Sequence, residues 1–237
     1  MRHYVITSLL ICLVFHAGYA ISETVSEYIP LQDGNKWTYR TNGTYGVYEK
    51  SIYVIPGFTQ INGVATKAVQ VLGGPYDRDK EYWTNDEGGI RVHGGYTPFT
   101  EIGSGTVILE PPMLVANSEM NIGETVSSTG KARFTFSGYG TFLLDYQSSF
   151  TLNEITTVTV PSGTYETVRY SGYYRMYGPI LGEQFDDTTT ITRWLARNIG
   201  AIKDTYADIY ASETNVLLST NVKIKPPFLP FLPLLLD

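Results

Sequence analysis

His93 is the residue in this sequence best suited to proton transfer near neutral pH, because a histidine side chain titrates close to that range. It lies in the segment GIRVHGG, beside a pair of glycines. Such a residue could act as a general base or complete a Ser-His-Asp triad. The sequence shows no strained turn that would present a nucleophilic serine, since Gly103-Ser104-Gly105 has the pattern of a loop. We therefore interpret His93 as a histidine near the surface, at the end of a strand.

Carboxylate groups offer a second kind of chemistry. Glu183, Asp186 and Asp187 lie near aromatic residues, and paired carboxylates hydrolyse glycosides when both reach one sugar. Adjacent residues of a strand point to opposite faces, so Asp186 and Asp187 cannot share a site unless that stretch is a loop. The acidic residues in 77–81 and 85–87 lack the spacing of an EF-hand calcium loop. A solvated edge that resists strand pairing explains them better.

Aromatic residues form a third candidate site. Rings flanked by Thr and Asn are common in carbohydrate-binding β modules, where they stack on sugar faces, and they are equally typical of packing pairs between strands. Carbohydrate binding is therefore kept as an alternative function. The residues concerned are Tyr82, Trp83, Tyr173, Tyr174 and Tyr177.

The N-terminal segment, residues 1–20, has the pattern of a secretory signal peptide. A basic residue precedes the apolar run 5–15, and small residues precede the expected cut, which leaves a chain that begins at Ile21. The run is shorter than the roughly 20 residues that a membrane-spanning helix needs. Cys12 follows Ile11, whereas a lipoprotein signal places a small residue before its cysteine. We expect a soluble exported protein, periplasmic or extracellular, with no transmembrane segment.

Cleavage of this segment would remove the one cysteine of the chain and two of its three histidines. Disulfides, thiolate catalysis, iron–sulfur clusters and zinc sites built on cysteine or on two histidines would then be excluded. The sequence predicts neither a metal nor a cofactor.

The composition indicates a β protein. Charged residues make up 17% of the 237 residues, against roughly 25% in soluble domains, and aromatic residues make up 14%. Aromatic and threonine side chains suit the pleated, half-buried surface of a sheet. The net charge of −6 argues against a nucleic-acid partner, and the hydrophobic content of 43% argues against disorder.

Short runs of alternating apolar and polar residues recur from about residue 31 to residue 224. The run 140–150 places Phe142 and Leu144 on one face, and turn dipeptides such as Asn42-Gly43 separate the runs. No stretch of 12 residues shows a convincing helical period. These patterns predict an all-β fold with little helix: a strongly curved antiparallel sheet, or a partly closed barrel or sandwich built of hairpins.

The predicted domain organisation has three parts. After the signal peptide, residues 21–225 form a single large β domain, or two β units that divide near residue 111, because similar strand-entry patterns begin near residues 29 and 112. Residues 226–237 form a Pro/Leu-rich apolar tail, whose prolines exclude a helix and a ladder strand. Exposed, this tail would be an apolar patch that needs a partner; packed back, it would plug a barrel or groove.

Four segments together carry a family resemblance: 28–39 (YIPLQDGNKWTY), 81–94 (EYWTNDEGGIRVHG), 158–170 (VTVPSGTYETVRY) and 193–206 (RWLARNIGAIKDTY). In this order they resemble a family of exported bacterial β proteins of unknown function, secreted or lipoprotein-like. Such chains are more distantly similar to the lipoprotein-carrier fold of the bacterial envelope. The resemblance implies a strongly curved sheet with an apolar concavity and supplies no active-site residue.

We predict a non-enzymatic exported β protein that binds an apolar small molecule or lipid, or another protein of the envelope or extracellular space. A carbohydrate-binding module is the alternative, and a carboxylate-dependent hydrolase ranks third. An apolar sheet face without a covering helix must be closed by a second sheet, by the tail, by a ligand or by a partner. The candidate ligand-binding residues on that face are Phe134, Phe136, Phe142, Leu144, Tyr174 and Met176. Trp37, at the entry of a strand, is expected in the core.

Overall fold

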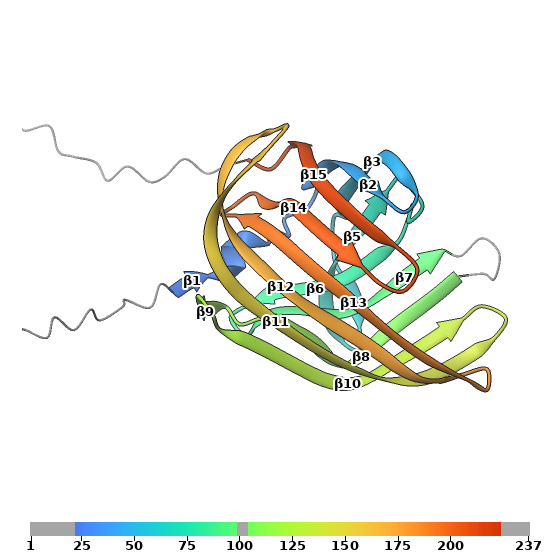
Figure 1. Ribbon diagram of the computed structural model, residues 1–237. Helices are drawn as coiled ribbons and strands as arrows, with labels where there is room; N and C mark the ends of the chain where they lie inside the picture. The colour runs from blue at the N-terminus through green and yellow to red at the C-terminus, as the bar shows by residue number, and fades with distance from the viewer. Residues whose placement is uncertain (1–21, 99–103, 224–237) are drawn as a thin grey trace, which may run out of the picture.

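The computed structural model describes residues 22–98 and 104–223, and β-strands make up most of this part of the chain (Figure 1). The predicted signal peptide and the Pro/Leu-rich tail lie outside these residues. The strands are β1 (Ser22–Thr24), β2 (Lys36–Gly43), β3 (Gly46–Val54), β4 (Thr59–Ile61), β5 (Val64–Leu72), β6 (Lys80–Asp86), β7 (Gly89–Pro98), β8 (Ser104–Ala116), β9 (Glu119–Asn121), β10 (Thr125–Phe136), β11 (Gly140–Val160), β12 (Gly163–Ile180), β13 (Glu183–Ala196), β14 (Gly200–Ala207) and β15 (Ser212–Thr220).

One helical element occurs within the described residues, the four-residue 3-10 turn η1 (Val25–Tyr28). In that part of the chain no helix has the length and apolar character needed to cross a membrane.

Twelve of the strands form a closed antiparallel barrel. Their order is β3, β2, β15, β14, β13, β12, β11, β10, β8, β7, β6 and β5, and β5 pairs with β3 again to complete the ring. The short strand β4 pairs antiparallel with the start of β5, and β1 pairs with β9 outside the ring. Most ring neighbours are consecutive strands joined by hairpins. The predicted fold class, an all-β antiparallel sheet curved toward closure, is confirmed.

Register shifts in the ladders let the long strands bend around the barrel. The β11–β12 ladder shifts between Leu152 and Glu154, and the β13–β14 ladder shifts between Trp194 and Leu195. An extra residue on one strand increases the local twist and bends that strand. β11, with 21 residues, therefore curves around one side of the molecule while it keeps β10 and β12 as its partners (Figure 1).

Tight turns with left-handed backbone connect some of the hairpins. Asn62 and Gly63 have φ values of 47° and 80°, and Leu181 and Gly182 have φ values of 52° and 88°. Two successive residues with positive φ are typical of type I′ turns, whose twist matches that of the flanking strands. Asn or Asp usually occupies the first position of such a turn, but the β12–β13 turn has Leu181 there, a residue type that rarely adopts positive φ.

The core lies on the inner face of the barrel. Along β11 the side chains of Leu144, Tyr146, Phe150 and Leu152 alternate with outward-facing polar residues, and all four are buried. A second group of buried residues gathers around Trp37, which is 6% exposed. The expectation that Trp37 belongs to the core is confirmed.

The N-terminal segment covers one end of the barrel. Val25 and Tyr28 of η1 are buried in the same core group as the β11 residues. The Asn85 amide donates hydrogen bonds of 2.9 Å to the backbone oxygens of Ser26 and Ile29, which fixes the segment to β6. The opposite end carries the β2–β3, β10–β11, β12–β13 and β14–β15 hairpin tips (Figure 1).

Candidate functional site

A cavity of about 120 Å³ lies inside the barrel, between the inner faces of β6, β7 and β8 and those of β11, β12 and β13. Most of its wall is apolar and includes Leu109, Met113, Phe150, Met176 and Ile191. The volume is below the roughly 300–1,000 Å³ of pockets for drug-sized ligands. It suits one short acyl chain or one aromatic group.

Two charged side chains line this cavity, Arg193 and Glu81. The Arg193 guanidinium carbon is 6.0 Å from the centre of the Trp83 ring, and the Glu81 Oε2 atom accepts a hydrogen bond of 3.0 Å from the Trp83 indole N–H. Glu81 is an exposed residue, whereas Arg193 is partly buried. Glu81 therefore belongs to the solvent-exposed part of the lining, and Arg193 to a less exposed part.

Tyr174 is one of two tyrosines, with Tyr170, that line the cavity wall. Burial is the largest cause that raises its pKa to about 12, and a hydrogen bond with Thr189 opposes the shift. Glu81 and Asp187 add to the rise through their negative charge. Tyr174 is therefore neutral at physiological pH and can act only as a hydrogen-bonding hydroxyl.

The six predicted ligand-binding residues share the inner face of the sheet, but they do not all reach the cavity. Tyr174 and Met176 line it. Leu144 is fully buried in the core beside them. The remaining three, Phe134, Phe136 and Phe142, form an aromatic group near the β10–β11 tip, with ring centroids 5.9 and 6.2 Å apart for the two successive pairs. Their role as ligand contacts stays a prediction.

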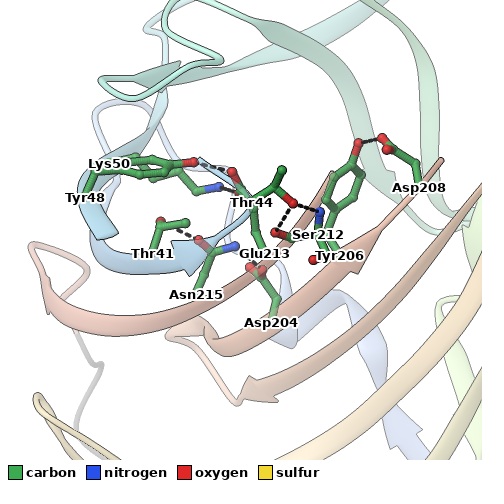
Figure 2. Close-up of polar contacts among 10 residues, drawn as sticks. All are labelled: Thr41, Thr44, Tyr48, Lys50, Asp204, Tyr206, Asp208, Ser212, Glu213 and Asn215. Atoms are coloured by element: carbon green, nitrogen blue, oxygen red, sulfur yellow. Dashed lines mark hydrogen bonds and ion pairs between the residues drawn. The ribbon is translucent and has the colours of Figure 1, made fainter. Parts of the chain in front are cut away.

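A buried polar cluster occupies the inner faces of β2, β3, β14 and β15 (Figure 2). The Glu213 carboxylate, with a side chain that is 2% exposed, accepts a hydrogen bond from the Tyr48 hydroxyl and pairs with Lys50 Nζ at 2.6 Å. Next to it, the Asn215 amide accepts from Thr41 Oγ1 at 2.6 Å and donates to Asp204 Oδ1 at 2.5 Å. These contacts tie the first ring strands to the last.

A second hollow, of about 230 Å³, lies on the outer face of β2, β13, β14 and β15. Its polar lining comes from Asn42, Thr190, Thr192, Thr205 and Thr214. These residues alternate along their strands with inward-facing ones, so the hollow is separated from the interior cavity by the sheet. It is an open groove lined largely by threonines, and Glu213, whose carboxylate is paired with Lys50, also borders it.

The aromatic residues of the carbohydrate hypothesis are divided between two faces. Trp83 and Tyr174 line the internal cavity. Tyr173 and Tyr177 alternate to the outer face of β12, where the Arg175 guanidinium carbon lies 4.8 Å from the Tyr177 ring centre. Tyr82 precedes Trp83 and is not part of the cavity wall. These residues therefore do not form one stacking platform.

His93 differs from the expectation of a residue near the surface, because it is 4% exposed. Its Nε2 atom lies 3.1 Å from Thr84 Oγ1, and burial, with a smaller effect of Arg91, lowers its pKa. The glycines that follow belong to β7 and form no loop. A Cβ atom at Gly94 would lie 2.1 Å from the Val107 backbone oxygen, so a glycine is needed where β7 and β8 approach closely.

The acidic pair Asp186-Asp187 lies on a strand, and its members point to opposite faces as predicted. Asp186 forms an ion pair with Arg175 on the outer face, which lowers the pKa of its carboxyl group. Asp187 faces inward, opposite Met176 in the β12–β13 ladder, and burial raises its pKa. Over residues 22–98 and 104–223, no three His, Cys, Asp or Glu side chains converge as metal ligands would.

Two functional candidates, Arg193 and Glu213, were missed from the sequence because charged residues in a strand are normally assigned to its solvent face. The signal that could identify them is period-two spacing. Arg193 follows Ile191 by two residues, and Glu213 precedes Leu217 by four, so each shares a face with an apolar residue.

The fold and cavity define a closed antiparallel β-barrel with a mostly apolar interior. No protein-family model matches the chain, and no curated protein matches it. Solved structures that resemble it include an exported-protein candidate with a YmcC-like fold from Bacteroides fragilis, at 14% identity and a TM-score of 0.42, covering 81% of this chain and 98% of that one.

A candidate lipoprotein from Parabacteroides distasonis has 12% identity and a TM-score of 0.40, with 81% of this chain and 97% of that one covered. The hypothetical lipoprotein YmcC from Escherichia coli has 8% identity and a TM-score of 0.37, with coverages of 81% and 89%. These descriptions are of the exported, lipoprotein-like kind that the four sequence segments resemble.

Asp79 provides a prediction on pH dependence. Burial, opposed by a hydrogen bond with Thr97, raises the pKa of its carboxyl group from 3.8 to about 6. The folded state then binds more protons than the unfolded state between these values, so this group makes stability fall as pH rises from about 4 to about 6. Asp79→Asn should therefore be more stable than the wild type at pH 7, with a smaller difference at pH 4.

Urea unfolding at both pH values measures this effect. Glu87→Gln, a charge-neutralising change at an exposed turn position, serves as the control and should show no comparable pH-dependent gain. An Asp79→Asn variant that loses more stability at pH 7 than at pH 4 would contradict the prediction.

Proposed function

We propose that this chain is an exported β protein that binds a small apolar molecule inside its barrel. The observation that carries the proposal is the internal cavity, which has a wall of Leu109, Met113, Phe150, Met176 and Ile191 and an exposed glutamate in its lining. Apolar ligands bind in such pockets because binding removes apolar surface from water. The sequence supports export through the signal-peptide pattern of residues 1–20.

The candidate groups for catalysis support a binding role over an enzymatic one. His93 is buried with a threonine as its side-chain partner, and the adjacent carboxylates of Asp186 and Asp187 point to opposite faces of β13. Neither arrangement places an acid and a base on one substrate.

Binding of 1-octanol, measured by isothermal titration calorimetry, tests the proposal with a neutral apolar probe, part of whose chain can fill the cavity while the rest extends through its opening. Ile191→Trp puts a larger side chain into the cavity and should abolish binding. Thr190→Trp makes the same chemical change at the adjacent, exposed position on the outer face and should leave binding unchanged. If the wild type does not bind octanol, or if both variants bind it equally well, the cavity is not a ligand site.

A protein partner is the second candidate. Large apolar side chains are exposed at the hairpin tips of the barrel end opposite η1, including Tyr139 (51% exposed), Leu181 (65%) and Tyr210 (67%). Exposed apolar groups gathered at one end of a molecule favour a contact surface. Sedimentation of wild type and a Tyr139→Ser, Leu181→Ser, Tyr210→Ser variant with material from the exported fraction would show whether these tips recruit a partner.

A further inference from the structure

Arg193 places a guanidinium group inside the barrel. The residue lies on β13, two positions from Ile191, and both side chains line the internal cavity. The guanidinium carbon is 6.0 Å from the centre of the Trp83 ring, which itself is buried. The cation therefore faces a wall that is mostly apolar.

Within residues 22–98 and 104–223, Arg193 has no carboxylate at ion-pair distance and no hydrogen-bond acceptor for its N–H groups; its contact is the face of the Trp83 ring. Lys50, a second cation directed into the barrel, differs in this respect because Glu213 neutralises it at 2.6 Å. Arg175, on the outer face of β12, is likewise paired with Asp186.

Asp204 and Glu81 are the acidic residues beside Arg193 in the ladder and in the cavity wall, and neither lies within ion-pair distance of it. Asp204 is opposite Arg193 in the β13–β14 ladder, and its Oδ1 atom accepts a hydrogen bond from the Asn215 amide. Glu81 accepts the hydrogen bond from Trp83 and is exposed, so water screens its charge. Among the described residues, this partly buried guanidinium with five N–H donors thus has no carboxylate within ion-pair distance.

Building on the apolar-ligand function proposed above, we propose that Arg193 binds the oxyanion head group of a small amphipathic ligand whose apolar part fills the cavity. Removing a cation from water without giving it a partner costs free energy, and an anionic group of the ligand would offset that cost. The planar guanidinium fork matches the two oxygens of a carboxylate or phosphate. Phe150 and Met176 supply apolar contact for the chain attached to that head group.

Calorimetric titration with matched eight-carbon probes tests this assignment: octanoate, octyl phosphate, 1-octanol and octylammonium. Hydrogen bonds to charged groups contribute enough for about a ten- to hundred-fold preference. The wild type should bind octanoate or octyl phosphate more tightly than octanol by this factor and octylammonium most weakly. The comparison of the two anions separates a carboxylate ligand from a phosphate ligand.

Two arginine variants locate the effect. Arg193→Gln should reduce the affinity for the anionic probe to that for octanol, while the affinity for octanol stays within about three-fold, and Arg193→Lys should keep part of the preference. Arg175→Gln, a matched change on the outer face of the neighbouring strand, should alter neither affinity. Circular dichroism checks that each variant is folded.

The outcomes separate this inference from the proposed function. Equal affinity of the wild type for anion and alcohol would overturn the role of Arg193 and leave the apolar site intact, and this comparison requires no variant. An equal loss of both affinities in Arg193→Gln would also overturn it, because the residue would then only shape the cavity. Failure of the wild type to bind any of the four probes would overturn the proposed function itself.

Discussion

Replacing Trp37 with alanine should lower the free energy of unfolding by about 3–5 kcal/mol, the range for truncation of a buried aromatic side chain. The ring is 6% exposed, and its indole N–H donates a hydrogen bond of 2.5 Å to the Ile199 backbone oxygen. A Cβ atom at Gly200 would lie 3.1 Å from the indole nitrogen, so the ring packs directly on the β13–β14 turn. The variant loses these contacts and leaves the carbonyl without its donor.

Equilibrium unfolding in urea, followed by circular dichroism, measures this loss. Trp194→Ala is the matched control, because Trp194 is only partly buried and stacks with Lys203 Nζ at 4.6 Å from its ring centre. We expect that control to cost about 1 kcal/mol. Equal costs for the two tryptophans would contradict the central position of Trp37 in the core.

Replacing Lys50 with methionine should destabilise the barrel by about 3–5 kcal/mol, because it leaves a buried carboxylate without its cation. The side chains of Lys50 and Glu213 are 11% and 2% exposed, and Nζ and Oε2 are 2.6 Å apart. Tyr48 also donates to Glu213, but one neutral hydroxyl cannot balance a full charge in the interior.

Two further variants separate the loss of the pair from the cost of the unpaired charge. Lys131→Met breaks an exposed pair with Asp145 of the same length, 2.6 Å, and should cost at most about 1 kcal/mol. The double variant Lys50→Met, Glu213→Leu removes both charges and should recover much of the stability lost in the single variant. A double variant less stable than Lys50→Met alone would mean that Glu213 stabilises the fold mainly through Tyr48.

Local patterns were sufficient to predict the β structure and, in β10 and β11, the faces of the side chains. In β10 and β11 the spacing of Phe134, Phe136, Phe142 and Leu144 placed all four on one face, and the structure has them on the inner side. This works because side-chain direction in a strand depends only on position along that strand.

Closure of the barrel was not predictable in the same way. Ser51 pairs with Leu72 where β3 meets β5, and Arg40 pairs with Val216 where β2 meets β15. The sequence of each strand does not indicate which of the other strands will be its partner. Partner choice depends on which faces remain to be covered once neighbouring hairpins have formed, which is a property of the whole chain.

The candidate site was predicted only in part for a related reason. Tyr174 and Met176 were identified because they are apolar or aromatic at alternating positions. Arg193 and Glu213 occupy equivalent inward positions, but a charged side chain is stable there only when another strand or a ligand supplies its partner. Glu213 obtains that partner, Lys50, from a strand 163 positions away in the sequence.

The pairing of β2 with β15 has a consequence for the order in which the chain can fold. The hydrogen bond between Thr41 and Asn215 links residues 174 positions apart, and contacts across such distances form slowly because the chain loses entropy before they are made. Until residues 212–220 are present, β2 and β14 each keep an open edge that can pair with another chain. The last strand is therefore the one whose arrival ends the period in which the nascent protein is prone to aggregate.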